Sequence, residues 1–89
     1  MEQDFRFADR LGPEKIVHIH DPASRLRAVV VVDNTACGPA IGGIRMAADA
    51  TTEECFRLAR AMSFKNAAAG LAHGGGKSVI FGDSHMEAP

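Results

Sequence analysis

The sequence has no long apolar run, no excess of charge of one sign and few cysteines, and each absence narrows the class of protein. No stretch approaches the roughly 18 apolar residues of a membrane span. Ten basic and eleven acidic residues are interspersed and give a net charge of −1, so electrostatics offer no basis for binding nucleic acid or an anionic membrane. The start, from Met1 to Arg6, lacks the apolar stretch of a signal peptide. Cys37 and Cys55 are therefore expected to be reduced thiols in a cytoplasmic protein.

The length of 89 residues suits one small domain or part of a larger one. Hydrophobic residues make up 46% of the chain, which is enough for a core. A domain of this size still buries only about 60–65% of the surface that its unfolded chain exposes, so oligomerisation would help it. No linker or repeat divides the chain. We expect one domain over residues 1–83 and a frayed tail over residues 84–89.

Local patterns predict four strands and two helices. Residues 2–10 read as a short helix that ends at Gly12-Pro13, and residues 15–21 and 25–33 read as strands joined by a short turn, which makes them antiparallel. The run of four valines at 29–32 is typical of a strand covered on both faces. Residues 37–46 suggest a loop and then a short strand, and residues 78–81 a third core strand.

The clearest helix signal starts at Thr51. Thr51 and Glu54 form a capping box, the helix is predicted to run to about Ala69, and Gly70 suits the position after its end. One face of this helix carries the apolar or small residues Cys55, Leu58, Ala59, Met62 and Ala69. The order of elements predicts an α/β fold, a small mixed β-sheet with helices packed on it.

Phe64 breaks the pattern of this helix, because it falls on the polar side near Arg57 and Arg60. An exposed phenylalanine favours a subunit or domain interface, and a distorted last turn is the alternative.

Lys65 and Lys77, twelve residues apart, are the most informative residues. Between them the sequence suggests the end of a helix, a glycine-rich loop at Gly74-Gly75-Gly76 and the start of a strand. Lysine commonly holds a carboxylate or polarises a carbonyl, so the pair predicts a site for a small anionic substrate. A nucleotide-binding P-loop does not fit, because Leu71 stands where its first glycine belongs and a strand, not a helix, follows the glycines.

Other candidate residues leave alternatives open. Gly42-Gly43 suits a β-bulge or an opening beside the two lysines, and Arg45 suits a loop anchor or an ion pair. His18 and His20 share a strand face, but no further ligands complete a metal set, so ordinary histidines are favoured. His73 and Cys37 are assigned structural roles: packing for Cys37, which has no identifiable paired base.

Three motifs together resemble a known family. Residues 38–46 (GPAIGGIRM), 61–67 (AMSFKNA) and 74–77 (GGGK) are similar, in order and spacing, to the N-terminal dimerisation and substrate-binding domain of the glutamate/leucine/phenylalanine/valine dehydrogenases. The resemblance covers roughly residues 5–83. It implies reversible NAD(P)-dependent oxidative deamination of an L-amino acid to a 2-oxo acid and ammonia.

The resemblance also implies roles for individual residues. Lys65 would bind the substrate α-carboxylate, and Lys77 would be the catalytic lysine that assists the attacking water at the imine carbon. Gly42 and Gly43 would line the substrate pocket, and Met62 would contact the substrate. Glutamate-specific members carry a lysine where this chain has Ile41, and an aliphatic side chain there would leave a substrate side-chain carboxylate unpaired. A branched-chain or aromatic amino acid is therefore expected.

Parts of such an enzyme are not found in this sequence. The family's catalytic aspartate would lie beyond Pro89, as would its Rossmann domain, and no G-x-G-x-x-G motif occurs. We expect this chain alone to bind no cofactor and to be inactive, with NAD(P) implied only for the full-length family. The alternative is a non-catalytic module, either a stand-alone homo-oligomer or a binder of small anions such as amino acids and 2-oxo acids.

Overall fold

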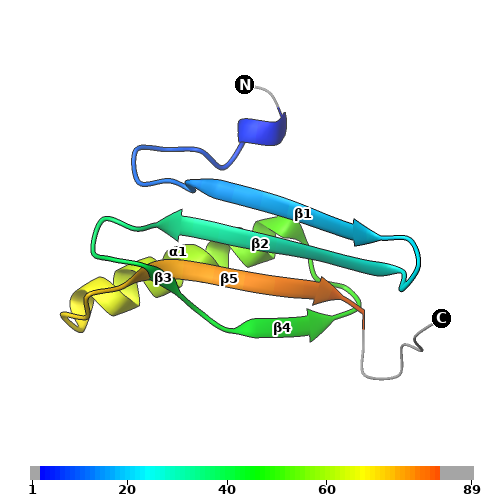
Figure 1. Cartoon of the computed structure of the whole chain (residues 1–89). Coiled ribbons are helices and arrows are strands. Elements are labelled where there is room, and N and C mark those ends of the chain that lie inside the picture. The colour runs from blue at the N-terminus through cyan, green and yellow to red at the C-terminus, as the bar shows by residue number, and fades with distance from the viewer. Residues whose placement is uncertain (1–2, 83–89) are drawn as a thin grey trace.

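The computed structural model describes residues 3–82 (Figure 1). A short 3₁₀ helix η1 (Gln3–Phe5) precedes two long strands, β1 (Lys15–Asp21) and β2 (Leu26–Asn34). Two short strands follow, β3 (Ala40–Ile41) and β4 (Ile44–Ala47), then the helix α1 (Thr52–Ala68) and the strand β5 (Gly74–Phe81). The tail predicted over 84–89 lies outside the described residues.

The five strands form one sheet, and its mixed character is as predicted. The segment 37–46, predicted to hold one short strand, contributes two, β3 and β4. Its order is β1-β2-β5-β3, and β4 pairs with β5 further along the same edge. β1 and β2 are antiparallel, as are β2 and β5, whereas β3 and β4 run parallel to β5. The segments 37–47 and 74–81 therefore lie side by side, which brings the two glycine-rich motifs together.

Helix α1 covers one face of the sheet, and the core lies between the two. Val29 and Val31 of β2 and Val79 of β5 are fully buried against Cys55 and Ala59 of α1. Since side chains alternate along a strand, Gly75 and Lys77 share the helix-facing side of β5 with Val79. This alternation decides which residues of β5 face α1.

The ends of α1 are as the local signals predict. The Thr51 hydroxyl accepts a hydrogen bond from the backbone N–H of Glu54 at 3.0 Å. At the other end Ala69 is the C-cap, and Gly70 adopts a φ of 71°, a region that favours glycine. The buried stripe differs near this end: Ala69 is exposed, whereas Asn66 is buried and donates to the Gly74 carbonyl at 2.8 Å.

The helix predicted over residues 2–10 is wrong. Only Gln3–Phe5 are helical, in one 3₁₀ turn. The following residues are held by α1 instead: the ring of Phe7 stacks on Phe56 with centroids 5.1 Å apart, and Asp9 pairs with Arg60. These long-range contacts, rather than local helical hydrogen bonds, fix the segment.

The glycine-rich loop predicted at residues 74–76 is also wrong. Gly74, Gly75 and Gly76 belong to β5, which therefore begins four residues before the predicted strand. A Cβ on Gly75 would lie 2.2 Å from the Ser63 nitrogen and 2.4 Å from the Ala59 carbonyl oxygen. The glycine lets the helix backbone approach the strand, so the space beside Gly75 is occupied by α1.

Candidate functional site

Lys77 lies half-buried on the helix-facing side of β5, beside the connection between β3 and β4. A Cβ placed on Gly43 would be 3.4 Å from the Lys77 Nζ, and that atom is the one neighbour within 4 Å. Glycine at position 43 therefore leaves open space directly beside the ammonium. Of the two alternatives for Gly42-Gly43, this geometry favours an opening at position 43.

Gly42 is glycine for a different reason. A Cβ there would lie 1.6 Å from the carbonyl oxygen of Gly76, a backbone atom that cannot move aside. The absent side chain at position 42 lets the connection pack directly on β5, while the absent side chain at position 43 borders the lysine. Gly42 thus allows close packing of the connection on β5, and Gly43 leaves space beside the Lys77 ammonium.

Lys65 and Met62 lie on the flank of α1 that faces β4. This flank is marked by the ion pair between Arg45 of β4 and Glu54 of α1, which settles the role of Arg45 in favour of an ion pair. Lys65 follows Glu54 by eleven residues, which brings it to within about 20° on the helix, and Met62 falls within about 80°. Both side chains are therefore on the side of α1 that faces β4, the side on which Lys77 and Gly43 lie.

Ile41 completes this edge. It pairs with Gly75 in the parallel register of β3 and β5, so it lies on the helix-facing side and is 47% exposed. The structure thus places Ile41, Gly43 and Lys77 along the sheet and Met62 and Lys65 along α1. We call these five residues the lysine flank.

The two ammonium groups of this flank have no partner within the part of the chain whose side chains are described. None of the ion pairs or hydrogen bonds of residues 4–82 involves the Nζ of Lys65 or Lys77. A lysine ammonium beside a gap left by glycine, with a second unpaired lysine on the adjoining flank of α1, makes a suitable place for a carboxylate.

The opposite flank of α1 holds a network of charges that the sequence reading missed. Arg60 donates from both terminal nitrogens to the Asp9 carboxylate at 2.9 Å and from Nε to Asp33 at 2.8 Å. Ser63 donates to the same Asp33 oxygen at 2.7 Å. Asp33 is 0% exposed, so its charge is compensated by Arg60 and Ser63. We call these four residues the arginine flank.

This network shifts two pKa values. Hydrogen bonds from Arg60 and from the Leu11 backbone lower the pKa of Asp9 to about 2. The pKa of Arg60 is raised, first by its hydrogen bond to Asp9 and then by that to Asp33. The one signal in the sequence was an aspartate directly after four valines, an acidic residue that continues a buried strand.

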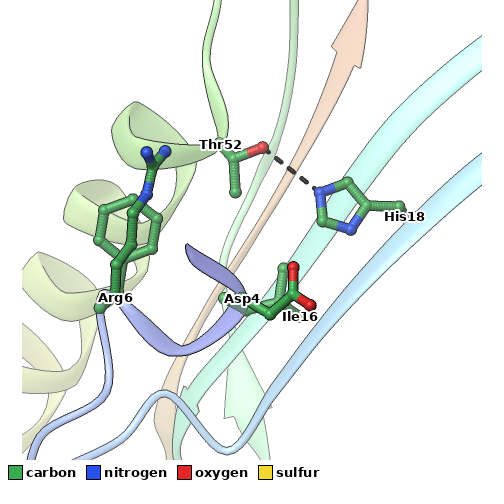
Figure 2. Close-up of a pocket in the computed structure, with 6 residues that line it drawn as sticks. Asp4, Arg6, Ile16, His18 and Thr52 are labelled. Atoms are coloured by element: carbon green, nitrogen blue, oxygen red, sulfur yellow. Dashed lines mark hydrogen bonds between the residues drawn. The ribbon is translucent and has the colours of Figure 1, made fainter. Parts of the chain in front are cut away.

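Two hollows lie on this second side of the molecule. One of about 400 Å³, drawn in Figure 2, lies between the N-terminal segment, β1 and the start of α1, and is lined by Asp4, Arg6, Phe7, Ile16, His18 and Thr52. Its charged residues have opposite signs, and Thr52 approaches His18 at 3.5 Å. A smaller hollow of about 200 Å³ lies beside Asp33, Arg60 and Phe64. Neither contains Lys65 or Lys77.

The remaining candidates have structural surroundings. A ring nitrogen of His73 lies 3.2 Å from the Pro39 carbonyl oxygen, which ties the start of β5 to the loop before β3. Cys37 is an exposed free thiol, and Cys55 is a buried one whose pKa is raised by its burial. Among the described residues, no three His, Cys, Asp or Glu side chains gather to hold a metal ion. Over residues 3–82, no helix is both long and apolar enough to cross a membrane.

Two of the relatives that this chain resembles in sequence are amino acid dehydrogenases. Valine dehydrogenase from Streptomyces virginiae is 51% identical over 80 residues, and leucine dehydrogenase from Bacillus subtilis is 45% identical over 87. These alignments cover 85% and 93% of this chain but 22% and 24% of the two enzymes. The chain therefore spans about a quarter of the length of the relatives that it matches.

Solved structures show the same fold. L-tryptophan dehydrogenase from Nostoc punctiforme matches 88% of this chain with a TM-score of 0.78 and 29% identity, over 25% of its own chain. The hetero-hexameric glutamate dehydrogenase from Thermus thermophilus matches 86% with a TM-score of 0.79 and 28% identity, over 20% of its own chain. The model of the Glu/Leu/Phe/Val dehydrogenase dimerisation domain matches residues 13–88. With most of its length inside that match, the chain belongs to the Glu/Leu/Phe/Val dehydrogenase family.

Proposed function

We propose that the lysine flank is the substrate-binding half of an amino acid dehydrogenase site. Lys65 binds the α-carboxylate of an L-amino acid or 2-oxo acid, and Lys77 acts on the water that attacks the imine carbon. Met62, Gly42 and Gly43 line the pocket. The complete reaction is reversible oxidative deamination with NAD(P) as hydride acceptor.

One observation carries this proposal: among residues 4–82 neither the Lys65 nor the Lys77 ammonium has a partner, and the Lys77 ammonium borders a space that glycine leaves open at position 43. A structural lysine gains stability from a carboxylate or carbonyl of its own chain, and none is present for either side chain among residues 4–82. A substrate carboxylate supplies the missing acceptor for one of them.

The substrate is a branched-chain or aromatic amino acid. Ile41 is an apolar residue on the helix-facing side of this edge, and it offers no partner to a second carboxylate. The relatives named for valine, leucine and L-tryptophan support this preference. A glutamate dehydrogenase matches the fold as well, so the preference rests on Ile41 rather than on the fold.

The chain by itself does not complete the site. We infer that the nicotinamide cofactor and the catalytic aspartate are supplied by regions of the longer relatives that this chain does not match, and that the 89 residues alone do not turn over substrate. We further infer a cytoplasmic homo-oligomer, because the matched family domain is a dimerisation domain. The second candidate function, a non-catalytic oligomerisation or anion-binding module, uses the same residues without the hydride step.

A titration of the isotopically labelled chain with 4-methyl-2-oxopentanoate tests the binding role. We expect chemical-shift changes at Lys65, Lys77 and Gly43, and an affinity about tenfold weaker in Lys65→Met, since one tenfold step is about 1.4 kcal/mol. Lys15→Met is the matched control, because it removes an exposed lysine on β1. The ketone 4-methylpentan-2-one, which lacks the carboxylate, is expected not to bind. An equal loss in both lysine variants would contradict a specific carboxylate site.

A further inference from the structure

Asn66 is a buried polar residue of α1 that the proposed chemistry does not use. It is 4% exposed, and its side-chain amide donates to the Gly74 carbonyl of β5 at 2.8 Å. Its backbone carbonyl accepts a hydrogen bond from the N–H of Leu71 at 3.0 Å. One residue therefore holds both the turn after the helix and the start of the strand that carries Lys77, where the end of α1 and the start of β5 meet in Figure 1.

The start of β5 has no side chains that could fix the position of α1 along the strand. Packed elements normally keep one register because their side chains interdigitate. Residues 74–76 are all glycine, and Gly75, which faces α1, meets the backbone of Ala59 and Ser63. Two backbones in contact present no ridge that opposes a slide of the helix. A directional hydrogen bond at this end of α1 supplies the missing constraint.

The position of α1 on β5 sets the separation of the two lysines. Lys65 directly precedes Asn66, and Lys77 follows Gly74 by three residues, about 10 Å along an extended strand. The hydrogen bond from Asn66 to Gly74 is thus a short connection between the two lysines. A slide of α1 by about 1 Å moves the Lys65 backbone by the same distance, and misplacement on that scale is enough to impair a two-point contact with a small ligand.

We propose that Asn66 is a positioning residue of the lysine flank, whose bond to Gly74 holds Lys65 and Lys77 at the separation that one 2-oxo acid spans. The inference rests on the proposed function, in which Lys65 takes the carboxylate and Lys77 acts at the neighbouring carbon. The 2-oxo oxygen on that carbon accepts a hydrogen bond from the Lys77 ammonium. A ligand with a carboxylate alone uses one lysine, so its binding does not depend on the separation.

A purely structural role for Asn66 is the competing explanation. Loss of a buried hydrogen bond would then lower the stability and affect all ligands alike. Ser63→Ala is the matched control for this possibility. The Ser63 hydroxyl also joins α1 to the sheet, at 2.7 Å, but its acceptor is Asp33 of β2 and not a residue of β5.

Titrations with 4-methyl-2-oxopentanoate and with 4-methylpentanoate, which lacks only the 2-oxo oxygen, test the proposal. In the wild type we expect the 2-oxo acid to bind about tenfold more tightly, a difference of about 1.4 kcal/mol. Asn66→Ala should reduce this ratio to about two or less, and the affinity for 4-methylpentanoate should stay within about twofold of the wild-type value. Ser63→Ala should keep the tenfold ratio. Urea denaturation checks that each variant is folded in the titration.

A second measurement uses the wild type and does not depend on the folding of a variant. Coupling between binding events is reciprocal, so a bond that favours the two-lysine contact is itself stabilised when that contact forms. We expect saturating 2-oxo acid to slow hydrogen exchange of the Asn66 side-chain amide about five- to tenfold, and 4-methylpentanoate to leave it unchanged. The Asn34 side-chain amide, which donates to the Leu11 carbonyl at 2.6 Å, is the internal control.

Failure of the proposed function and failure of this inference give different results. If neither acid binds the wild type, the proposed function is overturned together with the positioning role. If both acids bind equally well, a carboxylate site stands and the two-lysine contact is overturned. If the 2-oxo acid keeps its advantage in folded Asn66→Ala, or if both acids slow the exchange of the Asn66 amide alike, the site stands and Asn66 is only a structural residue.

Discussion

The two flanks of α1 both carry basic side chains, but the arginine on one flank is paired with carboxylates and the lysines on the other are not paired within the described chain. On the arginine flank, one guanidinium is shared between the carboxylates of Asp9 and Asp33, and the Ser63 hydroxyl also donates to Asp33. On the lysine flank, two ammonium groups have no acceptor from the described chain, and that of Lys77 lies beside Gly43. The comparison separates charge that stabilises the fold from charge that is available to a ligand.

The difference follows from burial. Asp33 is removed from water, and a buried carboxylate without a partner would cost several kcal/mol, so the fold supplies Arg60. Lys65 is exposed and Lys77 only half-buried, so water can solvate both ammonium groups. The pairing of Arg60 with Asp9 constrains the N-terminal segment, whereas the charges of Lys65 and Lys77 are not neutralised by the described chain.

Replacement of Arg60 by alanine is the strongest test of this contrast. The variant leaves the fully buried Asp33 carboxylate without its counter-ion, and breaking such a pair costs about 3–5 kcal/mol. Lys65→Ala removes a side chain that pairs with none of the described residues, and we expect a change within about 0.5 kcal/mol. Urea denaturation followed by circular dichroism measures both free energies of unfolding. Comparable losses in the two variants would show that the lysine flank is structural as well.

The glycines of the two motifs sharpen the comparison. Gly75→Ala places a methyl group 2.2 Å from the Ser63 nitrogen and 2.4 Å from the Ala59 carbonyl oxygen. Because both are backbone atoms, we expect the free energy of unfolding to fall by about 2–3 kcal/mol or more. Gly43→Ala meets only the end of the Lys77 side chain at 3.4 Å, so its stability should change by less than about 1 kcal/mol.

The second glycine variant has an additional readout. The methyl group of Gly43→Ala occupies the space beside the Lys77 ammonium, so binding of 4-methyl-2-oxopentanoate should weaken while thermal unfolding stays near the wild-type temperature. If both variants lose stability equally, position 43 is a packing position and the opening beside Lys77 has no binding role.

Local signals were enough to predict α1 and the mixed sheet. The capping box at Thr51, the glycine after the helix and the valine-rich strand are each encoded within a few residues, and their predicted bounds differ from the observed ones by a residue or so. Family resemblance supplied the roles of the lysine flank, and the structure places these residues along one side of α1 and the adjoining sheet edge. Their roles stay predictions until ligand binding is measured.

The sequence-based predictions failed where contacts with residues distant in the sequence determine the local structure. The segment around Phe7 and Asp9 looks helical locally, but its partners Phe56 and Arg60 are about fifty residues away. The three glycines have poor strand propensity, and they form a strand because the backbone of α1 needs their lack of side chains. The small residues Cys55, Ala59 and Ser63 on the facing side of the helix were the signal for this approach, since small residues on both surfaces permit close packing.

The smallest expected effect concerns Asp9, the exposed end of the arginine flank. Its pKa is about 2 in the folded chain, below the value of 3.8 that applies without Arg60 and the Leu11 N–H, so the folded state binds this proton less readily than the unfolded state. Its contribution to the free energy of unfolding is therefore complete above about pH 4 and is lost progressively as the pH falls toward 2. Glu14, whose pKa is lowered by hydrogen bonds from Thr35, adds a loss of the same sign. Urea midpoints between pH 2 and 5 should fall less steeply in Asp9→Asn than in the wild type, and added salt should reduce the difference because the carboxylate is exposed. Identical pH profiles in the two proteins would show that Arg60 is held by Asp33 alone, and that the arginine flank ends inside the core.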